Sequence, residues 1–158
     1  MPSHAKKEVK PFTPAQERIA GPIMRVMSAV TTWAYRASKG KVGGKFLRGA
    51  PVCLLTMTGR KSGRRLTLPL IYTPHGDDVL LVASKGGMER HPLWYLNLVA
   101  EPEIEIQVGS TTRKMLSRQA SDEEKKELWP RLCEVYPDFD DYQRRTERNI
   151  PVMICSPR

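Results

Sequence analysis

The chain has 158 residues, of which 40% are hydrophobic and 27% charged, as in one ordinary globular domain. No apolar run approaches the roughly 20 residues that cross a bilayer, and the N-terminus has no apolar segment of a signal peptide. The net charge of +9 comes almost entirely from residues 1–49, which carry ten Lys or Arg and two Asp or Glu. Residues 50–158 have a net charge of only +1, which argues against a nucleic-acid-binding surface. We therefore expect a single cytoplasmic domain without a nucleic-acid partner.

The N-terminal part divides into a tail and a helix. Residues 1–21 are expected to form a flexible basic segment, followed by one domain over 22–158. Apolar side chains recur at helical spacing after Pro22, which suits a first helical turn: Ile23, Met27, Val30 and Trp33. This amphipathic, basic helix either docks on its own domain or lies on the headgroups of a membrane. Peripheral contact with the inner face of the membrane therefore stays open, as does the choice between monomer and homodimer.

The middle of the chain alternates apolar runs with turns. Strands are predicted at 52–57, 66–73 and 79–83, joined by turns at 58–65 and 75–78. Pro69 lies inside the second run, which indicates an edge strand or a bulge. A short helix over 91–99 follows.

The rest of the chain continues this pattern of short elements. We expect strands at 104–108, 115–118 and 152–155. Ser121 and Glu124 form a capping box that opens a helix, which Pro130 should kink or restart. A short helix at 140–148 is also expected. Six or so antiparallel strands with few helices indicate an α+β, mainly β fold: a small barrel with helices packed outside.

Side chains that catalyse alone are scarce. The three histidines and three cysteines lack the spacing of metal ligands, so no metal site is predicted. Neither a nucleophile elbow nor a nucleotide-binding glycine motif is present. If the protein is an enzyme, a bound cofactor performs the difficult step.

The segment TGRKSGRR, residues 58–65 (the basic turn), contains four cations, the Ser62 hydroxyl and two glycines. The guanidinium group of arginine binds phosphate or carboxylate through two parallel N–H donors, and glycines let backbone amides approach an anion. An exposed, solubilising hairpin turn explains the same residues.

A second segment, ASKGGMERHPLWYLN, ends a strand in Ser84, Lys85 and two glycines. A Gly-Gly step lets backbone amides face a planar ring, and Ser84 could bind a reacting carbonyl. Trp94 and Tyr95 cannot both face the core, because they are adjacent on a helix. Alternatively, the segment is an ordinary connection between a strand and a helix, with Trp94 packed in the core.

The third feature is a set of aromatic residues spaced by three, Tyr136, Phe139 and Tyr142. They form either one wall of an apolar substrate pocket or an ordinary stripe of the core.

These motifs, in order, resemble the deazaflavin-dependent nitroreductase family of actinobacteria. The resemblance rests on TGRKSG, ASKGG, HPLWYLNL, YPDFDDY and IPVMIC, and it covers about Thr32 to Ser156. Members have a split β-barrel and bind coenzyme F420, a deazaflavin with a phosphate and a polyglutamate tail. The resemblance implies hydride transfer from reduced F420 to a quinone, an activated enone or a nitro compound.

The resemblance also implies roles for residues. The phosphate and tail are expected on the basic turn, and the ring on the second segment. The expected cofactor-binding residues are Thr56, Arg60, Lys61, Ser62, Gly63, Arg64, Arg65, Ala83, Ser84, Lys85, Gly86, Gly87, Pro92, Trp94, Tyr95 and Asn97. Ser84 or Tyr136 is expected to return the proton, and the acceptor is expected against Ile71, Tyr136, Phe139 and Tyr142.

Two positions depart from the family member that reduces nitroimidazoles. It has tyrosines where this chain has Ile71 and Phe139, so a more apolar pocket for quinones or enones is expected. The alternatives are an FMN-binding oxidoreductase of the same fold, in which the turn holds one phosphate, and a non-catalytic F420 carrier.

Overall fold

The computed structural model describes residues 13–46 and 49–158. Seven strands form one antiparallel sheet in the order β2-β1-β5-β6-β7-β4-β3. The strands are β1 (Val52–Thr58), β2 (Arg65–Ile71), β3 (Thr73–His75), β4 (Asp78–Val82), β5 (Glu103–Val108), β6 (Thr111–Gln119) and β7 (Val152–Pro157). The helices are α1 (Pro14–Ser38), the short 3-10 helix η2 (Lys85–Gly87), α2 (Leu93–Ala100), α3 (Asp122–Val135) and α4 (Asp138–Arg145).

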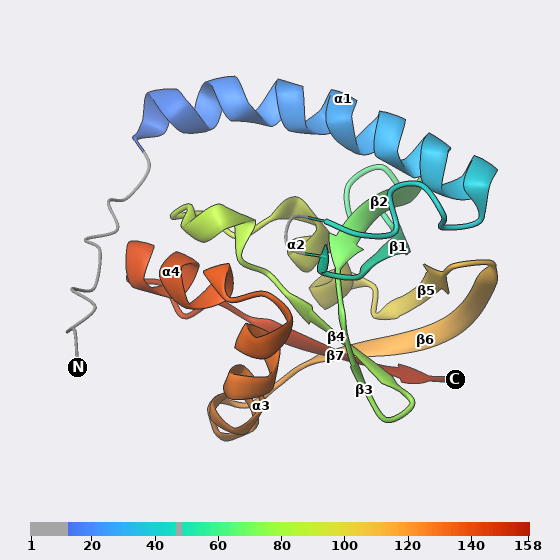
Figure 1. Cartoon of the computed structure of the whole chain (residues 1–158). Coiled ribbons are helices and arrows are strands. Elements are labelled where there is room, and N and C mark those ends of the chain that lie inside the picture. The colour runs from blue at the N-terminus through green and yellow to red at the C-terminus, as the bar shows by residue number, and fades with distance from the viewer. Residues whose placement is uncertain (1–12, 47–48) are drawn as a thin grey trace.

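The sheet curls because of its connectivity. β2 and β3 are its two edge strands, yet only Tyr72 separates them along the chain. The two edges must therefore approach each other at this residue, which bends the sheet into a half-barrel (Figure 1). This confirms the expected α+β split barrel, with one more strand than the pattern indicated. Pro69 lies on edge strand β2, as expected.

Alternating residues of β4 build two layers of the core. Val79 and Leu81 face the inside of the curled sheet, where Trp94 and Leu98 of α2 pack. Leu80 and Val82 face the other side and are covered by residues of α3 and α4. This period-2 pattern positions both helical layers against one sheet.

Helix α1 begins earlier than expected. Thr13 caps it, its side chain accepting from the Gln16 amide in a capping box. Pro22 lies inside α1 instead of in its first turn, and the expected division at residue 21 falls within the helix. The rest of the expected tail, residues 1–12, lies outside the described residues.

Two helical expectations near the C-terminus had different outcomes. Ser121 caps α3 through the capping box with Glu124, as expected. The helix does not restart at Pro130 but continues to Val135, so the restart is excluded, whereas a kink there stays a prediction. Leu132, fully buried in the core, holds the continuing turn in place.

Candidate active site

The basic turn joins β1 to β2 and is closed by its own backbone. The Gly59 amide donates to the Arg64 carbonyl and the Gly63 amide to the Gly59 carbonyl, both at 2.8 Å. Gly63 has a φ of 70°, a conformation that favours glycine. The turn therefore has a defined shape, while all four cationic side chains are exposed: Arg60, Lys61, Arg64 and Arg65.

Asn97 of α2 fixes this turn to the domain. Its Oδ1 accepts from the Arg60 amide at 3.0 Å, and its Nδ2 donates to Met57 Sδ at 3.7 Å. The side chain is buried beneath the turn. Asn97 thus positions the basic turn from behind, and a direct contact with a cofactor stays a prediction.

The segment of residues 83–91 (the Ser84 loop) has an unusual backbone. Ser84 is right-handed helical, but Lys85, Gly86 and Gly87 follow with φ of 45°, 64° and 79°. A right-handed residue followed by a left-handed one turns successive amides into a concave nest that attracts negative oxygen atoms. The Ser84 side chain is half-buried beside this nest.

Arg148 holds the carbonyl side of the Ser84 loop. Its guanidinium donates to the carbonyls of Met88 at 2.7 Å, Ser84 at 2.7 Å and Ala83 at 3.1 Å. Its Nη1 also lies 3.2 Å from His91 Nδ1, and burial together with the Arg148 charge lowers the pKa of that imidazole. Arg145 adds a bond from its Nη1 to the Gly86 carbonyl at 2.8 Å.

The sequence did not predict that these two arginines belong to the site. They lie near the C-terminus, far from the loop in sequence, and no motif marks an arginine that binds carbonyls. The two side chains hold four carbonyls of the loop. The amides of Ala83, Gly87 and Met88 donate to backbone carbonyls, so the nest is left to the amides of residues 84–86.

Gly87 brings the Ser84 loop against α4. A Cβ atom at this position would lie 2.6 Å from the Tyr142 carbonyl oxygen and 3.0 Å from Tyr142 Cα. Only glycine permits this approach together with a φ of 79°. The loop and the expected acceptor-binding residues are therefore direct neighbours.

The expected acceptor-binding residues come together on one side of the sheet. The rings of Tyr136 and Phe139 lie 5.0 Å apart and those of Phe139 and Tyr142 6.5 Å apart (together the aromatic cluster). Ile71 packs against the same core layer. Tyr136 and Phe139 are buried and Tyr142 is half-buried, so the cluster is part of the core, and its role as a wall of the acceptor pocket stays a prediction.

The two tyrosine hydroxyls of the cluster share a hydrogen bond of 3.1 Å. Burial, followed by this bond, raises the pKa of Tyr136. Tyr136 consequently stays protonated, and its role as a proton donor stays a prediction.

The other expected site residues pack or form hydrogen bonds within the protein around the basic turn and the Ser84 loop. Trp94 packs in the core, and Pro92 is buried at the cap of α2. Tyr95 donates its hydroxyl to Gln119 Oε1 at 2.7 Å. The Thr56 hydroxyl lies 2.8 Å from that of Thr67, and Ala83 is fully buried. Their binding roles stay predictions.

The residues present fit a planar ring with an anionic tail. The basic turn offers exposed cations, and the Ser84 loop offers an amide nest next to an aromatic cluster. Within residues 13–46 and 49–158, no three His, Cys, Asp or Glu side chains group as metal ligands. None of the described helices is long and apolar enough to cross a membrane.

Comparison with known proteins agrees with this arrangement. The family model described as F420H2-dependent quinone reductase matches residues 27–157. An F420H2-dependent quinone reductase of Mycobacterium tuberculosis is 38% identical over 127 residues, covering 78% of this chain and 85% of that protein. Another M. tuberculosis protein bearing the same family name is 42% identical over 118 residues, covering 75% of this chain and 99% of that protein.

A solved structure described as an F420H2-dependent reductase superposes with a TM-score of 0.63 at 37% identity, covering 67% of this chain and 94% of that one. A second, described as a domain-swapped dimer, has a TM-score of 0.65 at 34% identity, covering 80% of this chain and 96% of that one. The chain therefore belongs to the F420H2-dependent quinone reductase family, and it is an oxidoreductase whose cofactor is coenzyme F420.

Proposed function

We propose that this enzyme reduces a quinone with reduced F420, using the basic turn, the Ser84 loop and the aromatic cluster as one site. The observation that carries the proposal is the bond between Asn97 and the Arg60 amide. It ties the basic turn to α2, the helix that directly follows the Ser84 loop. An anionic tail and the ring attached to it can thus be held by neighbouring segments.

The cofactor-binding part has two chemically different halves. Arg60, Lys61, Ser62, Arg64 and Arg65 supply charge and a hydroxyl for the phosphate and tail, with Gly63 shaping the turn. The amide nest of residues 84–86 is expected to face the ring oxygens. When bound, reduced F420 supplies a hydride from C5 of its ring.

The acceptor is expected against Ile71 and the aromatic cluster. A quinone ring suits an apolar wall, and its two oxygens need hydrogen-bond donors. A hydride and one proton together convert a quinone to its hydroquinone. The Tyr136–Tyr142 hydroxyl pair and Ser84 are the groups we expect to donate to a quinone oxygen and supply that proton.

Ligand binding and turnover test the proposal directly. The purified protein is mixed in turn with F420, FMN and haem, and menadione is then added to the complex with reduced F420. We expect F420 binding and return of the absorbance of oxidised deazaflavin. Tight FMN binding without F420 binding would contradict the proposal. F420 binding without oxidation by any quinone, enone or nitro compound would identify a carrier instead.

We further propose that α1 brings the enzyme to an anionic membrane surface, where lipophilic quinones dissolve. Five apolar side chains of α1 recur every three or four residues, and each is more than half exposed (the outward face): Ile19, Ile23, Val26, Val30 and Trp33.

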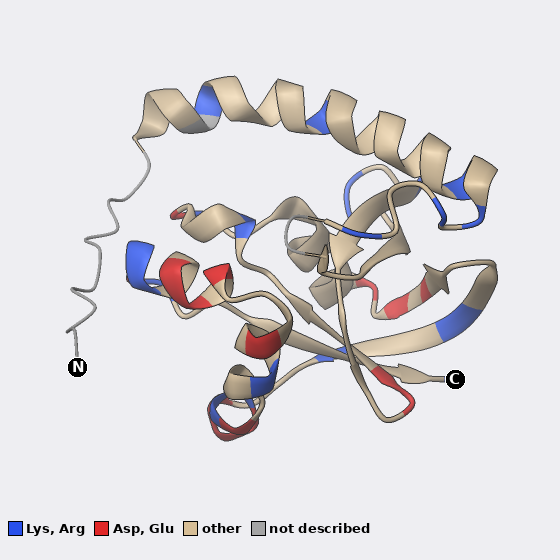
Figure 2. Cartoon of the chain, viewed as in Figure 1, with Lys and Arg blue, Asp and Glu red and all other residues tan. Residues whose placement is uncertain are grey.

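The opposite side of α1 touches the domain, since Thr32 and Tyr35 are buried. Tyr35 anchors it, accepting from the Gly109 amide at 2.8 Å. Residues 13–46 contain six Lys or Arg and one Glu, and Figure 2 shows the arginines along the helix. A basic helix with an apolar face that includes Trp suits a lipid interface.

Pairing of two chains through the outward face is the competing explanation. The related domain-swapped dimer makes a homodimer of this chain reasonable. The two explanations differ in the oligomeric state that they predict for the protein in dilute solution.

A further inference from the structure

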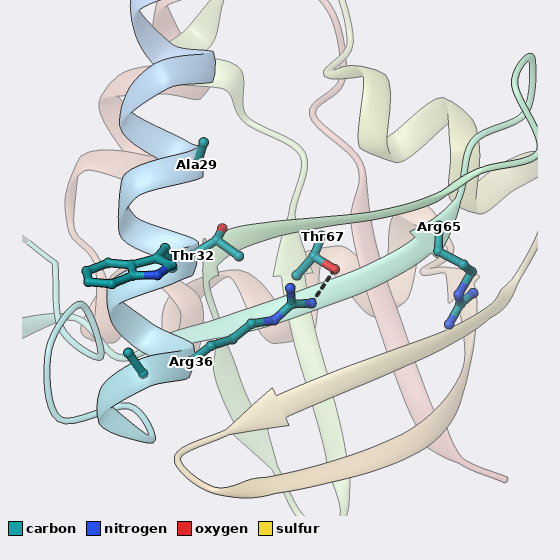
Figure 3. Close-up of a pocket in the computed structure, with 7 residues that line it drawn as sticks. Ala29, Thr32, Arg36, Arg65 and Thr67 are labelled. Atoms are coloured by element: carbon teal, nitrogen blue, oxygen red, sulfur yellow. Dashed lines mark hydrogen bonds between the residues drawn. The ribbon is translucent and has the colours of Figure 1, made fainter.

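A pocket with a volume of about 650 Å³ lies between the C-terminal half of α1 and β2. Its polar lining comes from Thr32 and Arg36 of α1 and from Arg65 and Thr67 of β2, with Trp33 among the other lining residues. Figure 3 shows the Arg36 side chain reaching from the helix to Thr67 on the strand. The pocket therefore combines two guanidinium groups with two hydroxyls.

The hydroxyl of Thr32 lacks a partner. The residue is 8% exposed, and among the described residues no atom forms a hydrogen bond with its Oγ1. An unsatisfied buried hydroxyl is costly, and native structures usually pair such groups with protein, water or ligand. Thr32 lines the pocket, but its Oγ1 is itself buried, so a rotation of the side chain about χ1 would be needed to bring the hydroxyl to a ligand there as a donor.

Both arginines are held in place by threonine hydroxyls, and Arg65 is partly neutralised by a long ion pair with Glu105. Arg36 Nη2 donates to Thr67 Oγ1 at 2.9 Å, and Thr67 in turn bonds Thr56 at 2.8 Å. Arg65 Nη1 donates to Thr58 Oγ1 at 3.3 Å, and its nearest carboxylate oxygen, on Glu105, is 3.7 Å away. Two guanidinium groups sharing one pocket favour an anion between them.

We propose that this pocket is an oxyanion subsite in which Arg36, Arg65, Thr32 and Thr67 bind a carboxylate or phosphate. Arg65 is also the last residue of the basic turn, so the subsite continues the anion-binding surface towards α1. One source of the oxyanion is the polyglutamate tail of the cofactor, and in that form the inference rests on the proposed function. The other source is a phospholipid headgroup, because Trp33 of the outward face lies at the same pocket.

Two substitutions test the subsite with little change to the fold. Thr32→Val keeps the shape of the side chain and removes the unpartnered hydroxyl, so the free energy of unfolding should stay the same or rise. Arg36→Gln removes the charge. Arg25→Gln is the matched control, since Arg25 is an exposed arginine of the same helix that does not line the pocket.

The first arm measures binding of F420 with its glutamate tail and of the deazaflavin riboside that lacks phosphate and tail. A carboxylate subsite predicts that Arg36→Gln weakens F420 binding about tenfold, Thr32→Val weakens it less, and riboside binding is unchanged. The loss should shrink at high salt.

The second arm measures binding to vesicles of anionic and of zwitterionic phospholipid. Loss of anionic-vesicle binding in both variants, with F420 binding unchanged, assigns the subsite to a headgroup. Effects no larger than those of Arg25→Gln in both arms would overturn the inference, as would equal losses for F420 and the riboside. Failure of the wild-type protein to bind F420 would refute the proposed function alone, since the vesicle arm still tests the pocket.

Discussion

Individual side chains behind the site determine its shape as much as those that face a ligand. Asn97 is buried under the basic turn and holds it through one backbone amide. Arg148 holds three carbonyls of the Ser84 loop. The asparagine could be singled out because it belongs to a motif, whereas Arg148 could not, because only the folded chain brings it to the loop.

The cations of the basic turn should bind the cofactor mainly by charge. We expect Arg60→Ala and Lys61→Ala each to cost about 1–3 kcal/mol of F420 binding at low salt, because charge-assisted hydrogen bonds are lost. Titration of F420 fluorescence at several salt concentrations measures the effect. Lys114→Ala on β6 is the control for net charge, and affinity equal to that of the control would show that the anion binds elsewhere.

Arg148→Ala should disturb the site by releasing the Ser84 loop. We expect the free energy of unfolding to fall by about 2–3 kcal/mol and F420 affinity to fall with it, since three carbonyls lose a charged donor. Arg148→Lys should recover little, because an ammonium lacks the planar fork that reaches several carbonyls.

Thermal denaturation and F420 titration report the two effects separately. Arg131→Ala, which removes an exposed ion pair with Glu134, is the control. A less stable Arg148→Ala protein with normal F420 affinity would show that the loop conformation does not govern binding.

At the level of elements, α3 is joined to β6 by its first turn. Ser121 and Glu124 complete the capping box, and the Glu124 carboxylate also pairs with Arg118 through two bonds of 2.9 and 2.8 Å. The Arg118 bond, followed by the Ser121 amide, lowers the pKa of Glu124 to about 2. The capping box was predictable from local sequence, but the pairing with Arg118 depends on where β6 ends.

This ion pair predicts a stability change in acid. A carboxyl group whose pKa is lowered on folding stabilises the protein above its ordinary pKa near 4.5, and the stabilisation disappears as the pH falls towards 2. Denaturant unfolding between pH 6 and roughly pH 2 should therefore show a loss that Glu124→Gln reduces. Glutamine can keep the capping bond through its Oε1, so the variant loses the charge and the second bond from Arg118 but not the cap, and Glu123→Gln is the control. An identical pH profile for Glu124→Gln and the wild type would contradict this role.

The whole molecule consists of a curled sheet with a helix extending over it (Figure 1). Only the C-terminal part of α1 is buried against the domain, whereas its outward face is exposed. Helical spacing in the sequence predicted an amphipathic helix and left open which surface its apolar side meets. In the folded chain the apolar side does not face the domain.

Substitution on the outward face should separate membrane binding from folding. We expect the double variant Val26→Asp and Val30→Asp to lose binding to anionic vesicles while its thermal midpoint stays unchanged, because both side chains are exposed. Cosedimentation with vesicles measures binding, and Val99→Asp, an exposed valine of α2, is the control.

Sedimentation velocity of the wild type and of the same double variant tests the competing explanation. A wild-type dimer that becomes monomeric in the double variant, with vesicle binding absent in both, would show that the outward face pairs two chains.

The sequence by itself determined the strand pattern, the Ser121 cap, the basic turn and the order of motifs that marks the family. These features depend on neighbours within a few residues, where side-chain period, capping and turn chemistry act directly. The tertiary structure alone decided that Arg145 and Arg148 shape the Ser84 loop, that Gly87 abuts Tyr142, and that Arg36 meets Thr67 across a pocket. Such contacts join segments distant in the chain, and they exist only once the curled sheet has fixed where its edges and helices lie.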